Sequence, residues 1–184
     1  MISGLKHIYL LGAGGIGMSA LGRYFLAQNI AVSGYDKTPN AYTKSLENDG
    51  FEITYNEQVD ALPSFMKNGP SQEILVIFTP AIPQDHPQKL YLIEQGFRLY
   101  KRSEILGLIA DAHPTIAVGG THGKTTTSTL IAHMLQHSGR KPVSFLGGVA
   151  VNYNTNFLAG QPNSILVAEA DEYDRSFLTL HPQT

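Results

Sequence analysis

Short apolar runs alternate along the chain with stretches whose apolar residues recur at helical spacing. The run His7–Leu11 leads directly into glycines, which is typical of a buried parallel strand. Apolar residues three and four positions apart then predict a helix over Gly15–Asn29. Because this alternation is repeated along the chain, the pattern predicts an α/β fold with a mostly parallel sheet and right-handed crossovers.

The remaining elements form two groups of the same design, in which a strand runs into a glycine-rich loop and then a helix. Further strands are expected at Ile30–Tyr35, Phe51–Tyr55, Ile74–Thr79, Phe97–Tyr100, Thr115–Val118, Val143–Leu146 and Ile165–Ala168. Further helices are expected at Ala41–Asp49, Pro87–Gln95, Glu104–Ala112 and Thr125–His137. The Gly- and Asn-rich stretch Gly147–Gly160 predicts a loop. We therefore expect a Rossmann-like domain over residues 1–103, followed by the start of a P-loop α/β domain over residues 104–184.

Composition and charge exclude several classes of protein. The 184 residues contain 13 basic and 15 acidic side chains and no cysteine. The small net charge argues against nucleic-acid or membrane binding through bulk charge, and the lack of cysteine excludes disulfides, thiolate zinc sites and cysteine catalysis. No apolar run approaches the length of a membrane span, and residues 1–11 do not resemble a secretory signal. A cytoplasmic protein is expected.

The first glycine-rich loop has the pattern G-x-G-x-x-G between a strand and a helix. Gly12 would permit the tight turn, Gly14 would let a diphosphate approach the backbone, and Gly17 would allow close helix–strand packing. The helix N-terminus offers N–H groups and partial positive charge to phosphates. Asp36, at the end of the next strand, is placed to accept hydrogen bonds from a ribose. The motif predicts nucleotide binding and by itself favours a dinucleotide.

The second loop, residues 119–125, ends in the G-K-T of a P-loop, although Val118 occupies the position of the usual first glycine. Backbone amides would bind phosphate, Lys124 would reach the β- and γ-phosphates, and Thr125 would bind Mg²⁺. Glu169 ends a later apolar strand, so it is the expected second Mg²⁺ ligand. His122, inside the loop, is expected to contact nucleotide or substrate, whereas His133 and His137 are expected on an ordinary helix surface.

Both loops together resemble the Mur ligases of peptidoglycan synthesis. Residues 120–127 look like that family's shortened P-loop, and Glu169–Asp174 look like its magnesium strand. Residues 6–17 resemble its UDP-diphosphate loop. The segments Phe78–Pro83, Arg102–Leu106, Phe145–Gly148 and Arg175–Phe177 are similar to those of the branch that attaches L-alanine.

This resemblance implies an ATP-dependent ligase that joins L-alanine to the lactyl carboxylate of UDP-N-acetylmuramate through an acyl phosphate, with ATP and Mg²⁺ as cofactors. It implies Lys124 and Glu169 as catalytic residues and Thr125 and Glu169 as metal ligands. The implied ATP-binding residues are Gly120, Thr121, His122, Gly123, Lys124, Thr125 and Thr126. The implied UDP-sugar-binding residues are Gly12, Gly14, Gly15, Ile16, Gly17, Asp36, Thr79 and Ala81.

Three other interpretations remain open at this point. The branch of the family that attaches a ready-made tripeptide to the same UDP-sugar has a very similar P-loop and acidic strand. A nicotinamide-dependent oxidoreductase would explain the first loop but not the second loop or Glu169. A non-catalytic UDP-sugar-binding module is the third. The family implies a C-terminal domain and a further metal-binding histidine that this sequence lacks, so we expect a fragment that binds UDP-sugar without forming an amide.

Overall fold

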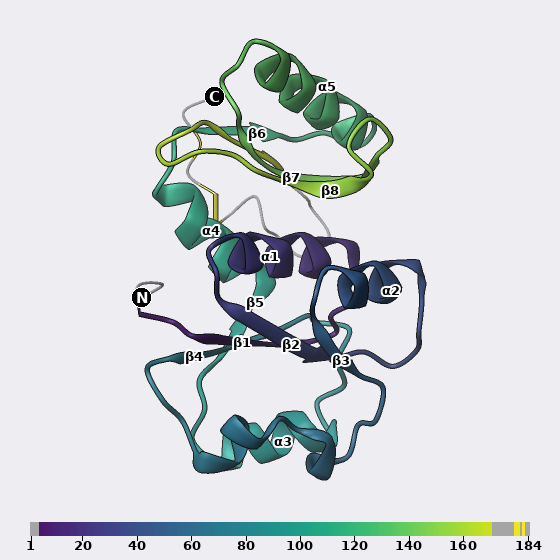
Figure 1. The fold of residues 1–184 in the computed structure, drawn as a ribbon, viewed down its shortest axis with the longest axis vertical. Coiled ribbons are helices and arrows are strands. Elements are labelled where there is room, and N and C mark those ends of the chain that lie inside the picture. The colour runs from purple at the N-terminus through teal and green to yellow at the C-terminus, as the bar shows by residue number, and fades with distance from the viewer. Residues whose placement is uncertain (1–3, 171–178, 181, 183–184) are drawn as a thin grey trace. The chain divides into compact units, whose positions relative to one another are not determined.

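The computed structural model describes residues 4–170, 179–180 and 182. The chain divides into two compact units, residues 1–102 and 103–184, and each has its own sheet (Figure 1). No helix in this described part has both the length and the apolar character needed to cross a bilayer. The acidic and aromatic positions 171–177 that the sequence singled out lie outside the described residues.

The first unit is built on a five-stranded parallel sheet with the order β3-β2-β1-β4-β5. Its strands are β1 (His7–Leu11), β2 (Ala31–Tyr35), β3 (Glu52–Thr54), β4 (Ile74–Phe78) and β5 (Leu99–Lys101). The chain order reverses between β1 and β4. In an open parallel sheet, the crevice at the carboxyl ends of such strands is where a ligand binds.

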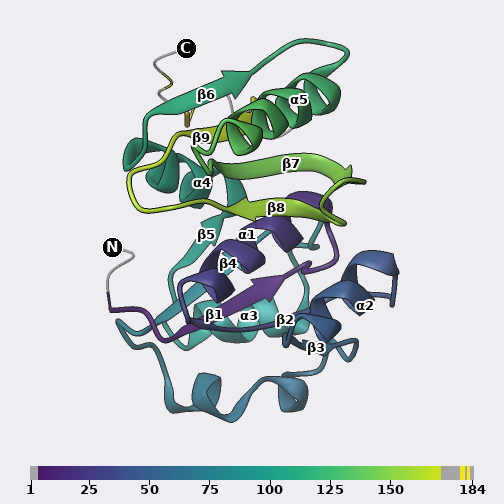
Figure 2. The ribbon, with the colours of Figure 1, turned by 45° about the horizontal axis from the view of Figure 1, so that its top comes forward.

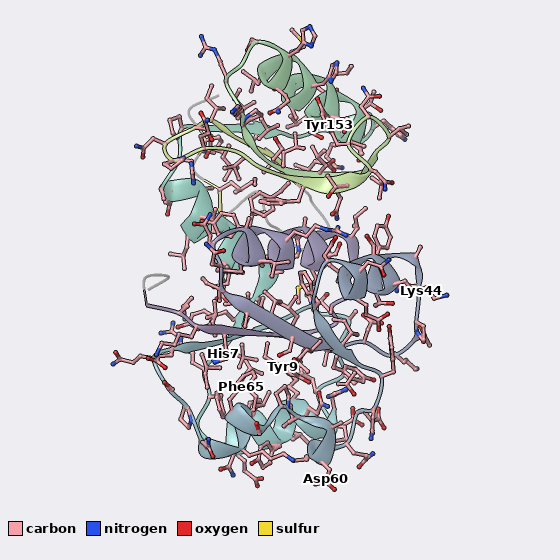
Figure 3. The ribbon with its side chains drawn as sticks, in the orientation of Figure 1. His7, Tyr9, Lys44, Asp60, Phe65 and Tyr153 are labelled. Atoms are coloured by element: carbon pink, nitrogen blue, oxygen red, sulfur yellow. The ribbon has the colours of Figure 1, made fainter. Side chains whose placement is uncertain are left out.

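Helices cover both faces of this sheet, as its apolar strands predict. One face carries α1 (Ile16–Ala27) and α2 (Ala41–Asn48), and the other carries α3 (Pro87–Glu94) with the 3₁₀ helices η1 (Val59–Ala61) and η2 (Ser64–Asn68) (Figure 1). The α3 side encloses a core that includes Tyr9 of β1 and Met66 of η2. On the same side, the His7 ring stacks on Phe65 with centroids 4.2 Å apart (Figure 3).

The second unit has a four-stranded sheet with the order β6-β9-β7-β8, visible edge to edge in Figure 2. Its elements are α4 (Arg102–Asp111, whose first residue belongs to the first unit), β6 (Thr115–Val118), α5 (Lys124–His137), β7 (Val143–Ala150), β8 (Thr155–Ala159) and β9 (Leu166–Glu169). Three strands are parallel, and β8 pairs antiparallel with β7. Helix α5 packs across the sheet (Figure 1).

The loop predicted over Gly147–Gly160 is wrong, because most of this stretch forms the β7–β8 hairpin. Strand β7 continues to Ala150, and β8 returns beside it with a register shift between Phe145 and Ala150. Gly and Asn, which lower strand propensity, masked the pattern. The hairpin forms nonetheless because Phe157 pairs directly with Phe145, with ring centroids 5.4 Å apart and both side chains buried.

Candidate functional site

The first glycine-rich loop lies at the carboxyl end of β1, and its shape is fixed by close contacts. Gly12 has a φ of +92°, a region that favours glycine, and a Cβ there would collide with the Thr79 methyl group. The N–H groups of Gly12 and Ala13 both donate to the carbonyl of Tyr35, over 2.8 and 3.0 Å. The loop is therefore pinned between the ends of β2 and β4.

Asp36 is held against this loop. Its Oδ2 accepts a 2.7 Å hydrogen bond from the Gly14 N–H, and its Oδ1 accepts a longer one, 3.4 Å, from the Thr38 N–H. A Cβ at Gly14 would lie 2.9 Å from Asp36 Oδ2 and 2.6 Å from Asn40 Nδ2. Glycine at position 14 is therefore required by the protein's own packing, and the carboxylate is positioned at the edge where a ribose is expected.

Helix α1 starts directly after the loop without an acidic residue. Gly15 is its N-cap, no side chain caps it, and the first turn contains no acid. Together with Ile16 and Gly17, this turn presents the positive end of α1 at the carboxyl edge of the sheet, a suitable place for an anion.

The packing role expected for Gly17 belongs instead to Gly22. A Cβ at Gly22 would lie 2.5 Å from the Phe51 ring and 3.0 Å from Leu10 Cδ1 of β1. At Gly17 the nearest atoms belong to the side chain of Arg102. The helix–strand packing role that the motif predicted for Gly17 is therefore wrong, because Gly22 makes those contacts.

Thr79 and Ala81 lie in the turn that follows β4. The Thr79 N–H donates to the Leu11 carbonyl over 3.2 Å, which joins this turn to the base of the first loop. The turn closes with a 3.1 Å hydrogen bond from the Ile82 N–H to the Thr79 carbonyl, and Ala81 is exposed at its tip. The structure thus brings Gly12, Asp36 and Thr79 to one edge of the first sheet.

His86 is a buried polar group on the same side, and sequence reasoning found no role for it. Its ring lies 4.6 Å from that of Tyr35, the last residue of β2. Both ring nitrogens are buried and have no hydrogen-bond partner among the described residues. Burial lowers the pKa of His86 from its ordinary value, so the neutral imidazole is favoured.

The second loop connects β6 to α5. Gly120 and Gly123 have φ angles of +135° and +77°, and Gly123 is the N-cap of α5. The side chains of Thr121 and His122 are exposed, as is that of Thr126 one turn later. Lys124 Nζ donates a 2.8 Å hydrogen bond to the Gly120 carbonyl, so the lysine arches back over its own loop. The second loop is therefore a short turn at the N-terminus of α5, with the Lys124 ammonium group beside it.

Glu169 joins three elements of the second unit. Its Oε1 accepts hydrogen bonds from the Gly147 N–H (2.8 Å) and Ser128 Oγ (3.1 Å), and its Oε2 accepts one from Thr125 Oγ1 (3.3 Å). Gly147 has no room for a Cβ against this carboxylate. Sequence reasoning named Thr125 and Glu169 as site residues but not Gly147 or Ser128. The Gly147 contact depends on the unexpected length of β7, and Ser128 belongs to no local pattern.

Thr125 and Glu169 also fit a magnesium ion. Mg²⁺ binds oxygen ligands at about 2.1 Å in octahedral geometry, which puts neighbouring ligands about 3 Å apart. The 3.3 Å between Thr125 Oγ1 and Glu169 Oε2 is close to that separation. Mg²⁺ commonly takes one or two carboxylates plus phosphates and water, so the lack of any cluster of three His, Asp or Glu in the described ranges is compatible with this site.

A cavity of about 350 Å³ adjoins the second loop, between α5 and the hairpin. Thr125 and Thr126 line one end, and His133 and Tyr153 line the other. His133 Nδ1 and the Tyr153 hydroxyl are 2.7 Å apart, which ties the hairpin (Tyr153 is labelled in Figure 3) to α5. His133, expected on a plain helix surface, is thus half-buried beneath the hairpin.

Comparison with known proteins gives consistent matches for both units. A family model described as "Mur ligase family, catalytic domain" matches residues 7–114, and one described as "Mur ligase middle domain" matches residues 118–177. The UDP-N-acetylmuramate–L-alanine ligase of Cytophaga hutchinsonii is 48% identical over 182 residues, and that of Flavobacterium johnsoniae is 47% identical over 178 residues. Each alignment covers 97% of this chain but only 38% and 39% of those two relatives.

Solved structures share the fold. The UDP-N-acetylmuramate-alanine ligase of Thermotoga maritima superposes with a TM-score of 0.84 at 30% identity, over 96% of this chain and 39% of that one. The UDP-N-acetylmuramate:L-alanyl-gamma-D-glutamyl-meso-diaminopimelate ligase of Neisseria meningitides gives 0.85 at 24% identity, over 98% of this chain and 59% of that one. The second likeness is informative for the fold alone.

Proposed function

The chain belongs to the Mur ligase family, and on that premise we propose that it carries two nucleotide-binding units of an ATP-dependent ligase joining L-alanine to the lactyl carboxylate of UDP-N-acetylmuramate. The observation that carries this proposal is the Thr125–Glu169 pair at the N-terminus of α5, directly after a lysine-bearing phosphate loop. Carboxylate, hydroxyl, lysine and loop amides are the groups that a γ-phosphoryl transfer requires.

The first step of the proposed reaction brings two anions together. A carboxylate oxygen attacks the γ-phosphorus of ATP, an O–P bond forms, and ADP leaves with the electrons of the broken bond. Lys124 would turn from the Gly120 carbonyl toward the β- and γ-phosphates, and the amides of residues 120–124 would hold their oxygens. Thr125 and Glu169 would hold Mg²⁺, which neutralises phosphate charge when bound.

The second step forms the amide. The amine of L-alanine attacks the acyl carbon, loses a proton, and expels phosphate through a tetrahedral intermediate. Positive charge at the second loop would stabilise the departing phosphate.

The first unit would hold the other end of the sugar nucleotide. The loop Gly12–Gly17 would bind the diphosphate, Asp36 the ribose, and the turn at Thr79 and Ala81 the uridine side. Binding energy realised there, far from the reacting atoms, would position the carboxylate for attack.

We favour L-alanine over a tripeptide as the proposed amino substrate, because relatives named for L-alanine addition are 47–48% identical over nearly the whole chain. An oxidoreductase that uses nicotinamide would leave the Thr125–Glu169 pair without a purpose. We also propose that the protein acts in the cytoplasm and that its reaction requires Mg²⁺.

The test is a coupled assay with the protein that carries this chain. We expect ADP and a product one alanine residue heavier than UDP-N-acetylmuramate only when ATP, Mg²⁺, the UDP-sugar and L-alanine are all present. Preference for a tripeptide in place of L-alanine would overturn the choice of amino substrate. Tight NADH binding with no affinity for the UDP-sugar would overturn the ligase proposal itself.

A further inference from the structure

A cavity of about 470 Å³ lies on the α3 side of the first sheet, and it is separate from the first glycine-rich loop. Alternate positions at the end of β4 and in the turn after it, 78, 80, 82 and 84, line this cavity together with residues of α3 and β5. Thr79 and Ala81, which we propose for the UDP-sugar, do not line it. We call it the Lys89 cavity. Its size is within the range of small-molecule sites.

Lys89 of α3 lines this cavity and is deeply buried. It is only 4% exposed, although its side chain carries a charge. Its Nζ donates a 2.9 Å hydrogen bond to Gln84 Oε1 and lies 4.8 Å from the centre of the Phe78 ring. Both of these partners are uncharged. A lysine is seldom so deeply buried without an opposite charge beside it, because removing an ammonium group from water is costly.

No acidic side chain balances this buried charge. Lys89 makes no ion pair with any carboxylate in the described part of the chain, and Asp85, four positions earlier, is exposed to solvent. The lining of the cavity includes a second cationic side chain, Lys101, and no aspartate or glutamate. An ammonium group has three N–H donors, and the Gln84 bond uses one of them. The Lys89 cavity therefore has the charge and the donors to hold an anion.

The apolar part of the lining favours an anion that carries a hydrocarbon group. Ile82 is buried, Phe78 and Leu99 are half-buried, and Ile93 is 53% exposed. An apolar group gains free energy on leaving water for such a surface. Inorganic phosphate would lose hydration without this gain, and the lining contains no arginine to donate paired hydrogen bonds to it. A single carboxylate matches the one buried ammonium group in charge.

We propose that the Lys89 cavity binds a small carboxylate with an apolar body, whose charge pairs with the Lys89 ammonium group and whose hydrocarbon part packs against Phe78, Ile82 and Ile93. The site is distinct from the proposed UDP-sugar and ATP sites, since its lining shares no residue with either of them. It does not depend on the ligase activity, so binding alone can test it.

The test compares probes that differ in charge and in apolar body. Isocaproate has both features, isocaproamide keeps the body without the charge, acetate keeps the charge with little body, and inorganic phosphate is an anion without a body. NMR titration of the protein that carries this chain would measure each affinity. We expect saturable binding of isocaproate, at least about 10-fold tighter than that of the other probes. No saturable binding of isocaproate, or equally tight binding of phosphate, would overturn the inference.

Lys89→Met tests the charge, because methionine keeps an unbranched apolar side chain in the buried position. It should weaken isocaproate binding by about 10-fold or more. Lys44→Met is the matched control, since it makes the same change at an exposed position of α2 (labelled in Figure 3). It should leave isocaproate affinity unchanged. Equal weakening in the two variants would mean attraction to overall charge and would overturn the inference.

Ile93→Asn tests the apolar wall at an exposed position, so it can be measured even if Lys89→Met does not fold. It should weaken isocaproate binding by about threefold or more, because part of the hydrocarbon contact is lost. Leu90→Asn is its control, since Leu90 is 50% exposed on the same helix and does not line the cavity. Isocaproate affinity in Ile93→Asn equal to that of the natural protein would contradict the proposed apolar contact.

Discussion

At the scale of single residues, Glu169 is the side chain whose replacement should affect both the stability of the second unit and the proposed catalysis. Its carboxylate accepts from Gly147, Ser128 and Thr125. Glu169→Gln keeps the length but replaces one acceptor oxygen with a donor, so at least one of these contacts is lost and the charge is gone. We expect a loss of about 1–3 kcal/mol in the free energy of unfolding and a fall of ligase turnover of about 100-fold or more.

Urea unfolding and the ADP assay would measure the two effects. Glu94→Gln, the same change at an exposed position of α3, should leave both unchanged. Full activity in Glu169→Gln would exclude this carboxylate from catalysis.

His86 gives a prediction about pH. The folded state disfavours the charged ring, chiefly through burial and to a smaller extent through Lys89, while Glu57 and Asp85 act in the opposite direction. Because the unfolded chain binds the proton more readily, the stability of the first unit should be fully present above the ordinary histidine pKa, about 6.5. It should decrease as the pH falls below that value.

Hydrogen exchange of the β1 and β4 amides between pH 5 and 8 would follow this change. In His86→Gln the dependence between pH 5 and 7 should flatten, whereas His137→Gln, at an exposed position, should keep it. A natural protein that gains stability on acidification would contradict the prediction.

The glycine motif could be recognised in the sequence, but the residues that its members contact in space could not. The pattern around Gly12, Gly14 and Gly17 correctly placed a turn between a strand and a helix. It could not show that Gly17 faces Arg102, 85 positions later in the chain, because that contact depends on the order of strands in the sheet. Ser128 and His86 were missed for the same reason, since neither belongs to a local pattern.

At the scale of elements, apolar periodicity predicted α1, α5 and the central strands to within a few residues. It failed for the β7–β8 hairpin, where glycines and asparagines break the alternation. That hairpin matters to the site, because its first strand carries Gly147 to Glu169 and its tip carries Tyr153 to His133.

The hairpin's stability should therefore depend on its buried aromatic pair. Phe157 is 6% exposed and lies opposite Phe145. Phe157→Ala should lower the stability of the second unit by about 3 kcal/mol, through lost burial and the cavity left behind. Val151→Ala, at a tip position that is 92% exposed, should stay within about 0.5 kcal/mol of the natural protein. Urea unfolding would measure both, and equal effects would mean that the aromatic pair does not hold β8 in place.

At the scale of the whole molecule, each unit has its own sheet and its own glycine-rich loop at a helix N-terminus. If each loop binds its own ligand, a substitution in one loop should leave the affinity for the other loop's ligand unchanged. Lys124→Ala removes the cation above the second loop. It should lower ATP affinity and ADP formation by about 100-fold or more while UDP-sugar affinity changes by less than about twofold.

Lys67→Ala, which replaces a surface lysine of η2, is the control and should change neither affinity. Both affinities can be measured on the same protein by calorimetry, and a collapse of UDP-sugar binding in Lys124→Ala would show that the two loops do not divide the work in this way.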